Sequence, residues 1–116
     1  MTERETARGL LHAEHAATRE RLAQLEREFA GIVGAAAAAG TDDEHDPEGA
    51  TIAFERQHVA ALVSQAQERL AQIGAALRKV EDGSYGVCDG CGQPIGADRL
   101  AARPASVTCV RCAAAG

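Results

Sequence analysis

The feature that most constrains this 116-residue chain is its four cysteines, which form two Cys-x-x-Cys pairs near the C-terminal end. The first pair is Cys88 and Cys91, and the second is Cys109 and Cys112. Two such pairs, joined by a short loop, can bring four sulfur atoms to one tetrahedral Zn²⁺. All four positions around that ion would be protein ligands. We therefore expect one structural zinc ion rather than a catalytic one.

Two other uses of paired cysteines are a redox-active dithiol and a pair of disulfides. The N-terminal residues, MTERETARG, lack the apolar run of a signal peptide, and no stretch approaches the ~18 apolar residues of a membrane helix. We therefore expect a cytoplasmic protein. In that reducing compartment, metal ligation is more common than disulfide formation. Glycines and prolines around the pairs also suit a zinc-binding loop.

The composition limits the core that the chain can build. Its apolar fraction is 46%, but 26 of those residues are alanine, and there are two Phe, one Tyr and no Trp. A chain with so few large apolar side chains needs a narrow seam between helices, a covalent or metal staple, or a partner. Bound zinc would supply folding free energy directly.

Two proline-poor segments, 2–39 and 47–82, predict long helices of about 54 Å each at ~1.5 Å per residue. Apolar residues recur at helical spacing along both, and the polar segment 40–49 between them is typical of a turn. We therefore predict an all-α fold. Residues 1–82 form an antiparallel coiled-coil hairpin with an acidic tip at 40–49, and residues 83–116 form a four-cysteine zinc finger.

This hairpin has a definite register if its turn centres near residue 44. Phe29 then faces Val59, Leu25 faces Val63, and Leu11 faces Leu77. Near the turn the first helix becomes GIVGAAAAAG, a run of small residues. The run either simply favours a helix or allows the two arms to approach closely.

The charge pattern excludes several classes of function. The net charge is −5 and the sequence pI is about 5.3, so no basic surface for nucleic acid is expected. A zinc-ribbon DNA binder remains a weaker alternative.

Other candidate sites are also weak in the sequence. His12 and His15 lie on one helical face but lack a third ligand for a metal. No nucleophile–base motif or phosphate-binding loop is present, so we expect no enzyme.

The segment ALRKVEDGSYGVCDGCGQPIGADRLAARPASVTCVRC resembles the zinc-finger signature of the DksA/TraR family of bacterial transcription factors. The resemblance implies a protein that binds RNA polymerase directly rather than DNA. In that family the hairpin enters the secondary channel of the polymerase, and the acidic tip approaches the catalytic region. The zinc finger docks on the channel rim, and the protein modulates transcription initiation.

The resemblance also implies which residues contact the partner. Asp43, Asp46, Glu48 and Ala50 are the candidate tip residues. The family's Asp-x-x-Asp-x-Ala tip corresponds to His45, Glu48 and Ala50 when the chain is aligned on the cysteines without a gap. The alternative is that these acids are solvated turn residues, with Asp46 capping the second helix. The acidic run lacks the ligand spacing of a calcium loop.

Arg99 and Arg103 are the candidate docking residues at the finger. Arg103 matches a basic residue that the family uses to bind the alarmone guanosine tetraphosphate. Gln72 and Ala113 stand where that site has lysines, so we expect no strong alarmone binding. The alternative function is a zinc-stapled interaction module that uses its hairpin against a different protein.

Overall fold

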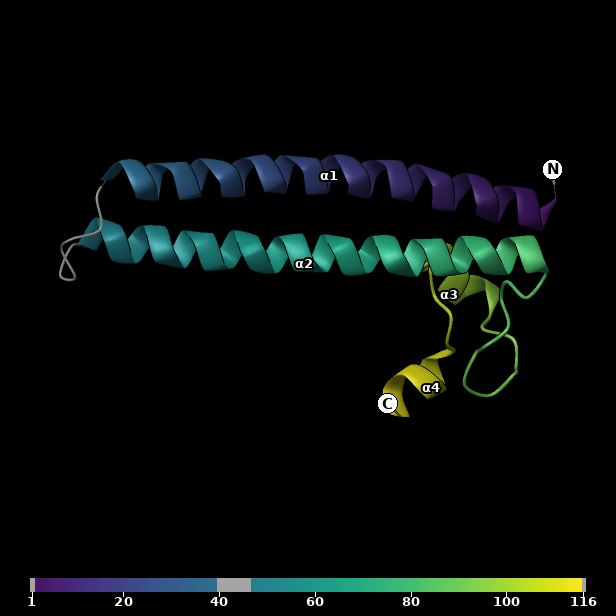
Figure 1. Cartoon of the computed structure of the whole chain (residues 1–116). Helices are drawn as coiled ribbons and strands as arrows, with labels where there is room; N and C mark the ends of the chain where they lie inside the picture. Colours follow the sequence, from purple (N-terminus) through teal and green to yellow (C-terminus); the bar gives the residue numbers. More distant parts are fainter. Residues whose placement is uncertain (1, 40–46, 116) are drawn as a thin grey trace. The chain divides into compact units, whose positions relative to one another are not determined.

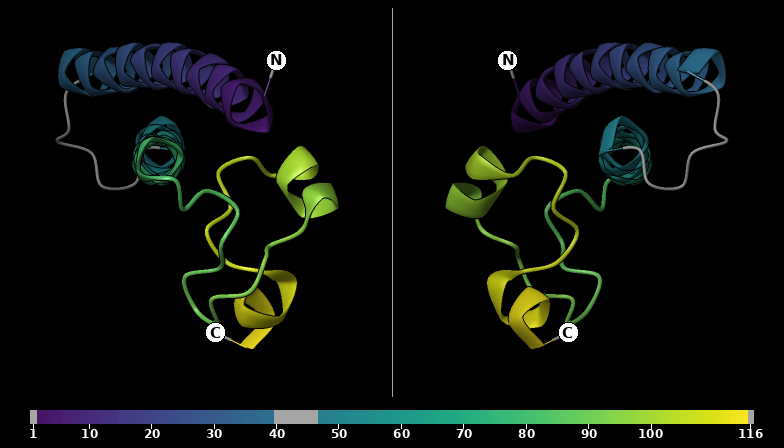
Figure 2. Two further views of the ribbon diagram at one scale, coloured as in Figure 1. Left: turned by 90° about the vertical axis from the view of Figure 1, so that its right-hand side faces the viewer. Right: turned by 90° about the vertical axis from the view of Figure 1, so that its left-hand side faces the viewer.

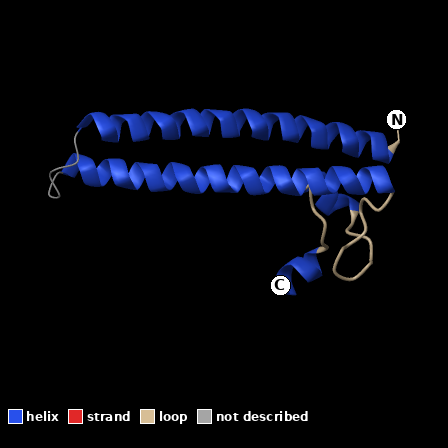
Figure 3. Cartoon of the chain, in the orientation of Figure 1, coloured by secondary structure: helices blue, strands red, loops and turns tan. Residues whose placement is uncertain are grey.

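The structure is a computed structural model that describes the backbone of residues 2–39 and 47–115, and the side chains of 2–37 and 49–115. It has two long helices, α1 (Glu3–Ala39) and α2 (Pro47–Asp82), followed by two short ones, α3 (Ala97–Ala102) and α4 (Val110–Ala115) (Figure 1). The described residues contain no strand (Figure 3). They include an isolated antiparallel bridge between Val87 and Pro94. The predicted all-α class is confirmed.

A capping box fixes the start of α1. The backbone N–H of Glu5 donates to Thr2 Oγ1 at 3.1 Å, and the backbone N–H of Thr2 donates to Glu5 Oε2 at 3.4 Å. This reciprocal pair satisfies donors that the first helical turn leaves free. The Thr-x-x-Glu pattern in the sequence is the local signal for this helix start.

The end of α2 at Asp82 follows from Gly83, which adopts a φ of 85°. Glycine takes this left-handed conformation without the steric cost of a Cβ atom. The backbone N–H groups of Ser84 and Tyr85 then fold back onto the carbonyl of Lys79, at 3.0 and 3.1 Å. Hydrogen bonds from the Ser84 hydroxyl and backbone N–H to Asp82 Oδ1 lower the pKa of Asp82.

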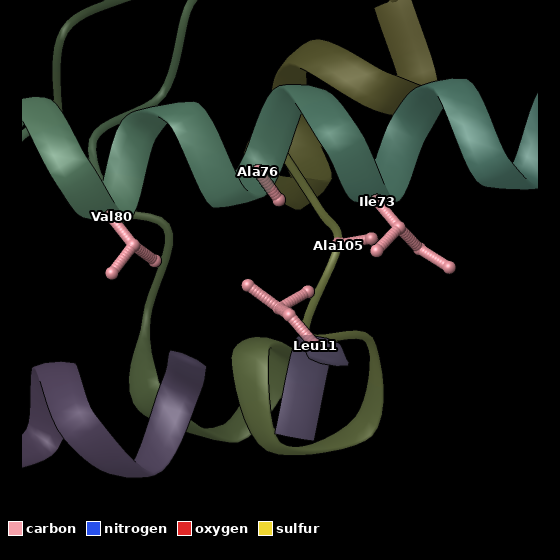
Figure 4. Close-up of a cluster of buried hydrophobic side chains, with 5 residues drawn as sticks. All are labelled: Leu11, Ile73, Ala76, Val80 and Ala105. Atoms are coloured by element: carbon pink, nitrogen blue, oxygen red, sulfur yellow. The ribbon is translucent and has the colours of Figure 1, made fainter. Parts of the chain in front are cut away.

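The chain divides into two compact units. We call Met1–Ala17 with Arg69–Gly116 the finger unit, and Thr18–Glu68 the helical unit. In the finger unit, a buried cluster joins both long helices to the finger. Figure 4 shows its members, Leu11, Ile73, Ala76, Val80 and Ala105. Leu77 and Tyr85 pack against this cluster, so Leu11 and Leu77 lie together as the register predicts.

Polar contacts also join α1 to α2 in the finger unit. Arg8 pairs with Glu81 at 2.9 Å, and Arg4 donates to the backbone carbonyl of Glu81 at 2.9 Å. Arg69 pairs with Glu14 at 2.5 Å. Because about a third or more of every side chain in these ion pairs is exposed to solvent, each pair adds at most about 1 kcal/mol to stability. The apolar cluster is therefore the main contact between these helix segments.

The helical unit has a thinner core. Its buried residues are Leu25, Val59 and Ala66, and half-buried side chains pack around them: Leu22, Phe29, Ile32, Leu62 and Val63. The predicted partners Phe29 and Val59, and Leu25 and Val63, fall in this one cluster. A methyl group added at Gly31 or Gly34 would meet nothing within 4 Å. Close approach of the arms therefore does not explain these two glycines.

Candidate metal centre

The four cysteine sulfurs converge on one site in the finger. All four lie within 4.8 Å of one another, and the described residues contain no other such group of metal-ligating side chains. The Sγ atoms of Cys91 and Cys109 are 3.8 Å apart, and no disulfide joins the four. A tetrahedral Zn²⁺ with bonds of about 2.3 Å holds its sulfurs about 3.8 Å apart. The geometry therefore fits the predicted zinc ion.

The first cysteine pair lies on a tight loop. The backbone N–H of Cys88 donates to the carbonyl of Gln93 at 2.8 Å, and that of Gly92 donates to the carbonyl of Cys88 at 2.9 Å. The backbone N–H of Gly90 points at Cys88 Sγ, 3.3 Å away. A Cβ atom at Gly90 would lie only 2.9 Å from Cys112 Sγ. A larger residue at position 90 would therefore force the loop or the Cys112 side chain to move.

The second pair is held against the first by backbone contacts. The N–H of Asp89 donates to the carbonyl of Val107 at 2.8 Å, which joins the two loops. The N–H of Cys109 donates to Cys88 Sγ at 3.2 Å. Cys109 directly precedes α4, which carries Cys112. Figure 2 shows α3 and α4 as separate short helices connected by irregular backbone.

The electrostatics of the cluster favour a bound cation. The backbone N–H of Cys109, above all, lowers the pKa of Cys88 to about 6, so this buried sulfur is readily a thiolate. The neighbouring sulfurs, Cys88 first, raise the pKa of Cys112 to about 12. Four thiolates cannot gather here without a compensating positive charge. A divalent ion supplies that charge, and zinc ligation requires the thiolate form.

Lys79, the only lysine in the chain, attaches α2 to the first cysteine loop. Its Nζ pairs with the Asp89 carboxylate and donates to the backbone carbonyl of Val87 at 3.1 Å. Only 14% of the Lys79 side chain is exposed, compared with 57% for Asp89. This contact was not predicted from the sequence. Its one available signal was a lone lysine ten residues before the acid of the Cys-Asp-Gly-Cys loop.

Two further contacts hold the loop between the cysteine pairs. The Tyr85 hydroxyl donates to the carbonyl of Pro104 at 2.7 Å. Burial, followed by the nearby Glu14 carboxylate, raises the pKa of Tyr85, so the phenol remains a donor. Arg99 Nε donates to the carbonyl of Thr108 at 2.9 Å. Arg99 thus supports the fold of the finger, whereas Arg103 is exposed.

The predicted tip lies mostly outside the described part of the chain. Asp43 and Asp46 are outside it. Glu48 belongs to α2, but its side chain is not described. Ala50 is an exposed residue of the same helix. The contacts assigned to these residues therefore stay predictions.

Comparison with known proteins agrees with this site. Residues 83–115 match the family described as the prokaryotic dksA/traR C4-type zinc finger. This region of the chain therefore belongs to the DksA/TraR zinc-finger family. The family match and the gathered cysteines together support one structural zinc ion.

Curated DksA relatives share this region. The chain is 54% identical over 41 residues to the RNA polymerase-binding transcription factor DksA of Caulobacter vibrioides, which covers 35% of this chain and 29% of that protein. It is 39% identical over 62 residues to the protein of the same name from Escherichia coli, covering 52% and 41% of the two chains. The match thus spans less than half of either relative.

The fold extends the likeness beyond the finger. The structure of transcription factor DksA2 from Pseudomonas aeruginosa matches with a TM-score of 0.79 and 23% sequence identity, covering 97% of this chain and 81% of that one. At this identity the match shows a shared fold. None of the described helices is long and apolar enough to cross a membrane.

Proposed function

We propose that this DksA/TraR protein is a transcription regulator that binds RNA polymerase directly. The single observation that carries the proposal is the zinc-finger match, since the relatives that share this region are named RNA polymerase-binding transcription factors. The fold shared with a DksA2 structure supports it. Such a regulator acts in the cytoplasm, is not an enzyme, and needs no direct contact with DNA bases.

The proposed mechanism is insertion of the acidic tip into the secondary channel, toward the active site, which modulates initiation. Asp43, Asp46, Glu48 and Ala50 are the proposed tip residues. Segment 40–49 carries five acidic side chains and no lysine or arginine, so it suits a basic channel or a bound cation. At the finger, exposed Arg103 is the better docking candidate, because Arg99 already donates to Thr108 within the finger.

The test is binding of the zinc-loaded protein to bacterial core RNA polymerase. A transcript-cleavage factor that occupies the secondary channel serves as competitor. Displacement by the competitor supports channel binding. Binding that the competitor leaves unchanged would move the contact elsewhere on the polymerase. No binding at micromolar concentration would overturn the proposal and favour an interaction module with another partner.

The tip is tested separately with the double variant Asp46→Asn and Glu48→Gln. We expect polymerase binding to remain nearly intact while the effect on initiation is lost, because the acids act at the active site rather than dock. Loss of binding instead would show that the acids are docking residues. A matched control is Glu20→Gln with Glu26→Gln, which removes the same charge from exposed positions of α1.

A further inference from the structure

A groove of about 440 Å³ lies between α1 and α2 in the helical unit. Its apolar wall consists of Ile32 and Ala35 from α1, and Ile52 and Val59 from α2. Val59 is buried, and the two isoleucines are half-buried. The groove therefore offers a largely aliphatic floor to a side chain entering from solvent.

The groove exists partly because Gly31 lines it. A Cβ atom at this position would meet nothing within 4 Å, so a larger side chain fits there sterically and would occupy the groove. Gly34, one turn further along α1, is equally free of neighbours but is not part of the groove wall. The two glycines provide a matched pair of positions for testing what the groove does.

The rim of the groove is acidic. Glu28 and Glu55 line it from opposite helices, and no lysine or arginine does. In the part of the chain that the structure describes, neither carboxylate forms an ion pair. The helical unit as a whole has ten acidic and four basic side chains, a net charge of −6. Both the local and the overall charge favour a cationic group.

We propose that this groove binds an arginine side chain of RNA polymerase. The inference rests on the function proposed above and adds a second contact, separate from the tip. The aliphatic stem of the arginine lies along Ile32 and Ile52, and the guanidinium group pairs with Glu28 and Glu55. Arginine suits this role because its planar head binds carboxylates through two parallel hydrogen bonds.

The surface beside the groove fits a protein partner. Phe54 is 72% exposed and lies four residues before His58, which lines the groove, so the two share one face of α2. An exposed phenylalanine next to a charged recess is typical of an interface anchor. A divalent cation fits less well, because Glu28, Glu55 and His58 do not form a metal-ligand group like that of the cysteines.

The first experiment fills the groove. Gly31→Leu is expected to weaken binding to core RNA polymerase by at least about tenfold, since its side chain takes the place of the arginine stem. Gly34→Leu, the matched control, is expected to bind within about twofold of the unchanged protein. Circular dichroism of both variants checks that each is folded. Equal affinity of the two variants would overturn the proposal.

The second experiment removes the charge. Glu28→Gln with Glu55→Gln is expected to weaken binding by about tenfold or more, because the guanidinium loses both carboxylates. Glu20→Gln with Glu26→Gln changes the net charge equally at exposed positions outside the groove. We expect this control to weaken polymerase binding by about threefold or less. Equal weakening by both pairs would mean that only overall charge matters. An effect of Gly31→Leu without an effect of the groove carboxylates would mean an uncharged occupant. Either result overturns the proposal.

The same binding assay separates this inference from the proposed function. If the unchanged protein fails to bind polymerase, the proposed function fails and the groove contact fails with it. If the unchanged protein binds and Gly31→Leu behaves like Gly34→Leu, only the groove contact fails. Competition by a cleavage factor, measured in parallel, reports on the channel independently of the groove.

Discussion

The finger unit and the helical unit both contain segments of the same two long helices, yet the interactions that stabilise each unit differ. The finger unit has eight basic and seven acidic side chains, a net charge of +1, and its cluster buries Leu11, Ile73 and Val80 completely. The helical unit has a net charge of −6, and the buried apolar residues among its described side chains are Leu25, Val59 and Ala66. The finger unit is stabilised by a metal ion and an apolar core. The helical unit is stabilised by a narrow row of apolar contacts between its helices, against the repulsion of its acidic side chains.

The proposed function gives this difference a physical reason. A unit that must keep a constant shape benefits from a metal centre, because zinc binding contributes folding free energy outright. Under the proposed function, the acidic groups of the helical unit repel one another but attract the basic surface of the partner. Charge and core size therefore differ between the two units, although α1 and α2 contribute to both.

Removal of zinc gives the largest expected effect. Structural zinc contributes about 10–16 kcal/mol of apparent binding free energy in small fingers, so its loss should unfold residues 83–115. Hydrogen exchange before and after chelation measures this. Amides around Cys88 and Cys109 should lose protection, whereas those around Leu25 and Val59 should change much less. Equal loss of protection in both units would show that the helical unit also depends on the metal for its stability.

Leucine truncation compares the two cores directly. Leu11→Ala should cost about 3–4 kcal/mol and Leu25→Ala about 2–3 kcal/mol, within the range for buried leucines. The first cost is larger because Leu11 packs against Ile73, Val80 and Ala105, and the seam around Leu25 can close more easily. Urea unfolding of the zinc-loaded protein gives both values. A larger cost at Leu25 would show that the helical unit carries the main core.

Much of this architecture could be predicted from local sequence. The cysteine spacing predicts the metal centre, and helical periodicity with Gly83 predicts where α2 ends. The remainder depends on contacts between distant residues. The packing of Ala105 on Leu11 and the pairing of Lys79 with Asp89 leave no periodic signal. The groove could not be predicted either.

The glycines near the groove show why the groove could not be predicted from the sequence. A glycine within a run of small residues suggests close packing of helices, but Gly31 and Gly34 both face open space. Their surroundings depend on how side chains from the other helix are placed, which composition does not determine. The same residue type has the opposite role at Gly90, where the backbone passes a sulfur atom.

Gly90→Ala should disturb the metal centre. A Cβ atom at this position would lie 2.9 Å from Cys112 Sγ, so the loop or the sulfur must move. We expect about a tenfold loss of zinc affinity, comparable to that caused by other changes that displace metal ligands. Competition with a chromophoric chelator measures it. Gly9→Ala is the control, since a methyl group there meets nothing within 4 Å. Unchanged zinc affinity in Gly90→Ala would show that the loop accommodates a methyl group at position 90 without moving the ligands.

Lys79→Met tests the contact between α2 and the cysteine loop. The substitution keeps the aliphatic stem but removes the donor to the Val87 carbonyl and the partner of Asp89. We expect a loss of about 1–2 kcal/mol, the usual cost of losing a charged hydrogen-bond donor at a mostly buried site. Arg8→Met removes a more exposed ion pair and should cost under about 1 kcal/mol. If urea unfolding gave the same loss of stability for both variants, the Lys79 contact would contribute no more than an exposed ion pair.

The smallest expected effect has the opposite sign and lies in the helical unit. Gly34→Ala should stabilise the protein by up to about 1 kcal/mol, because alanine favours a helix and the new methyl group meets nothing within 4 Å. A rise in the thermal unfolding midpoint of the zinc-loaded protein would record it. The same substitution thus weakens one unit at Gly90 and strengthens the other at Gly34. A destabilising Gly34→Ala would mean that the helical unit is more tightly packed near this glycine than its thin core indicates.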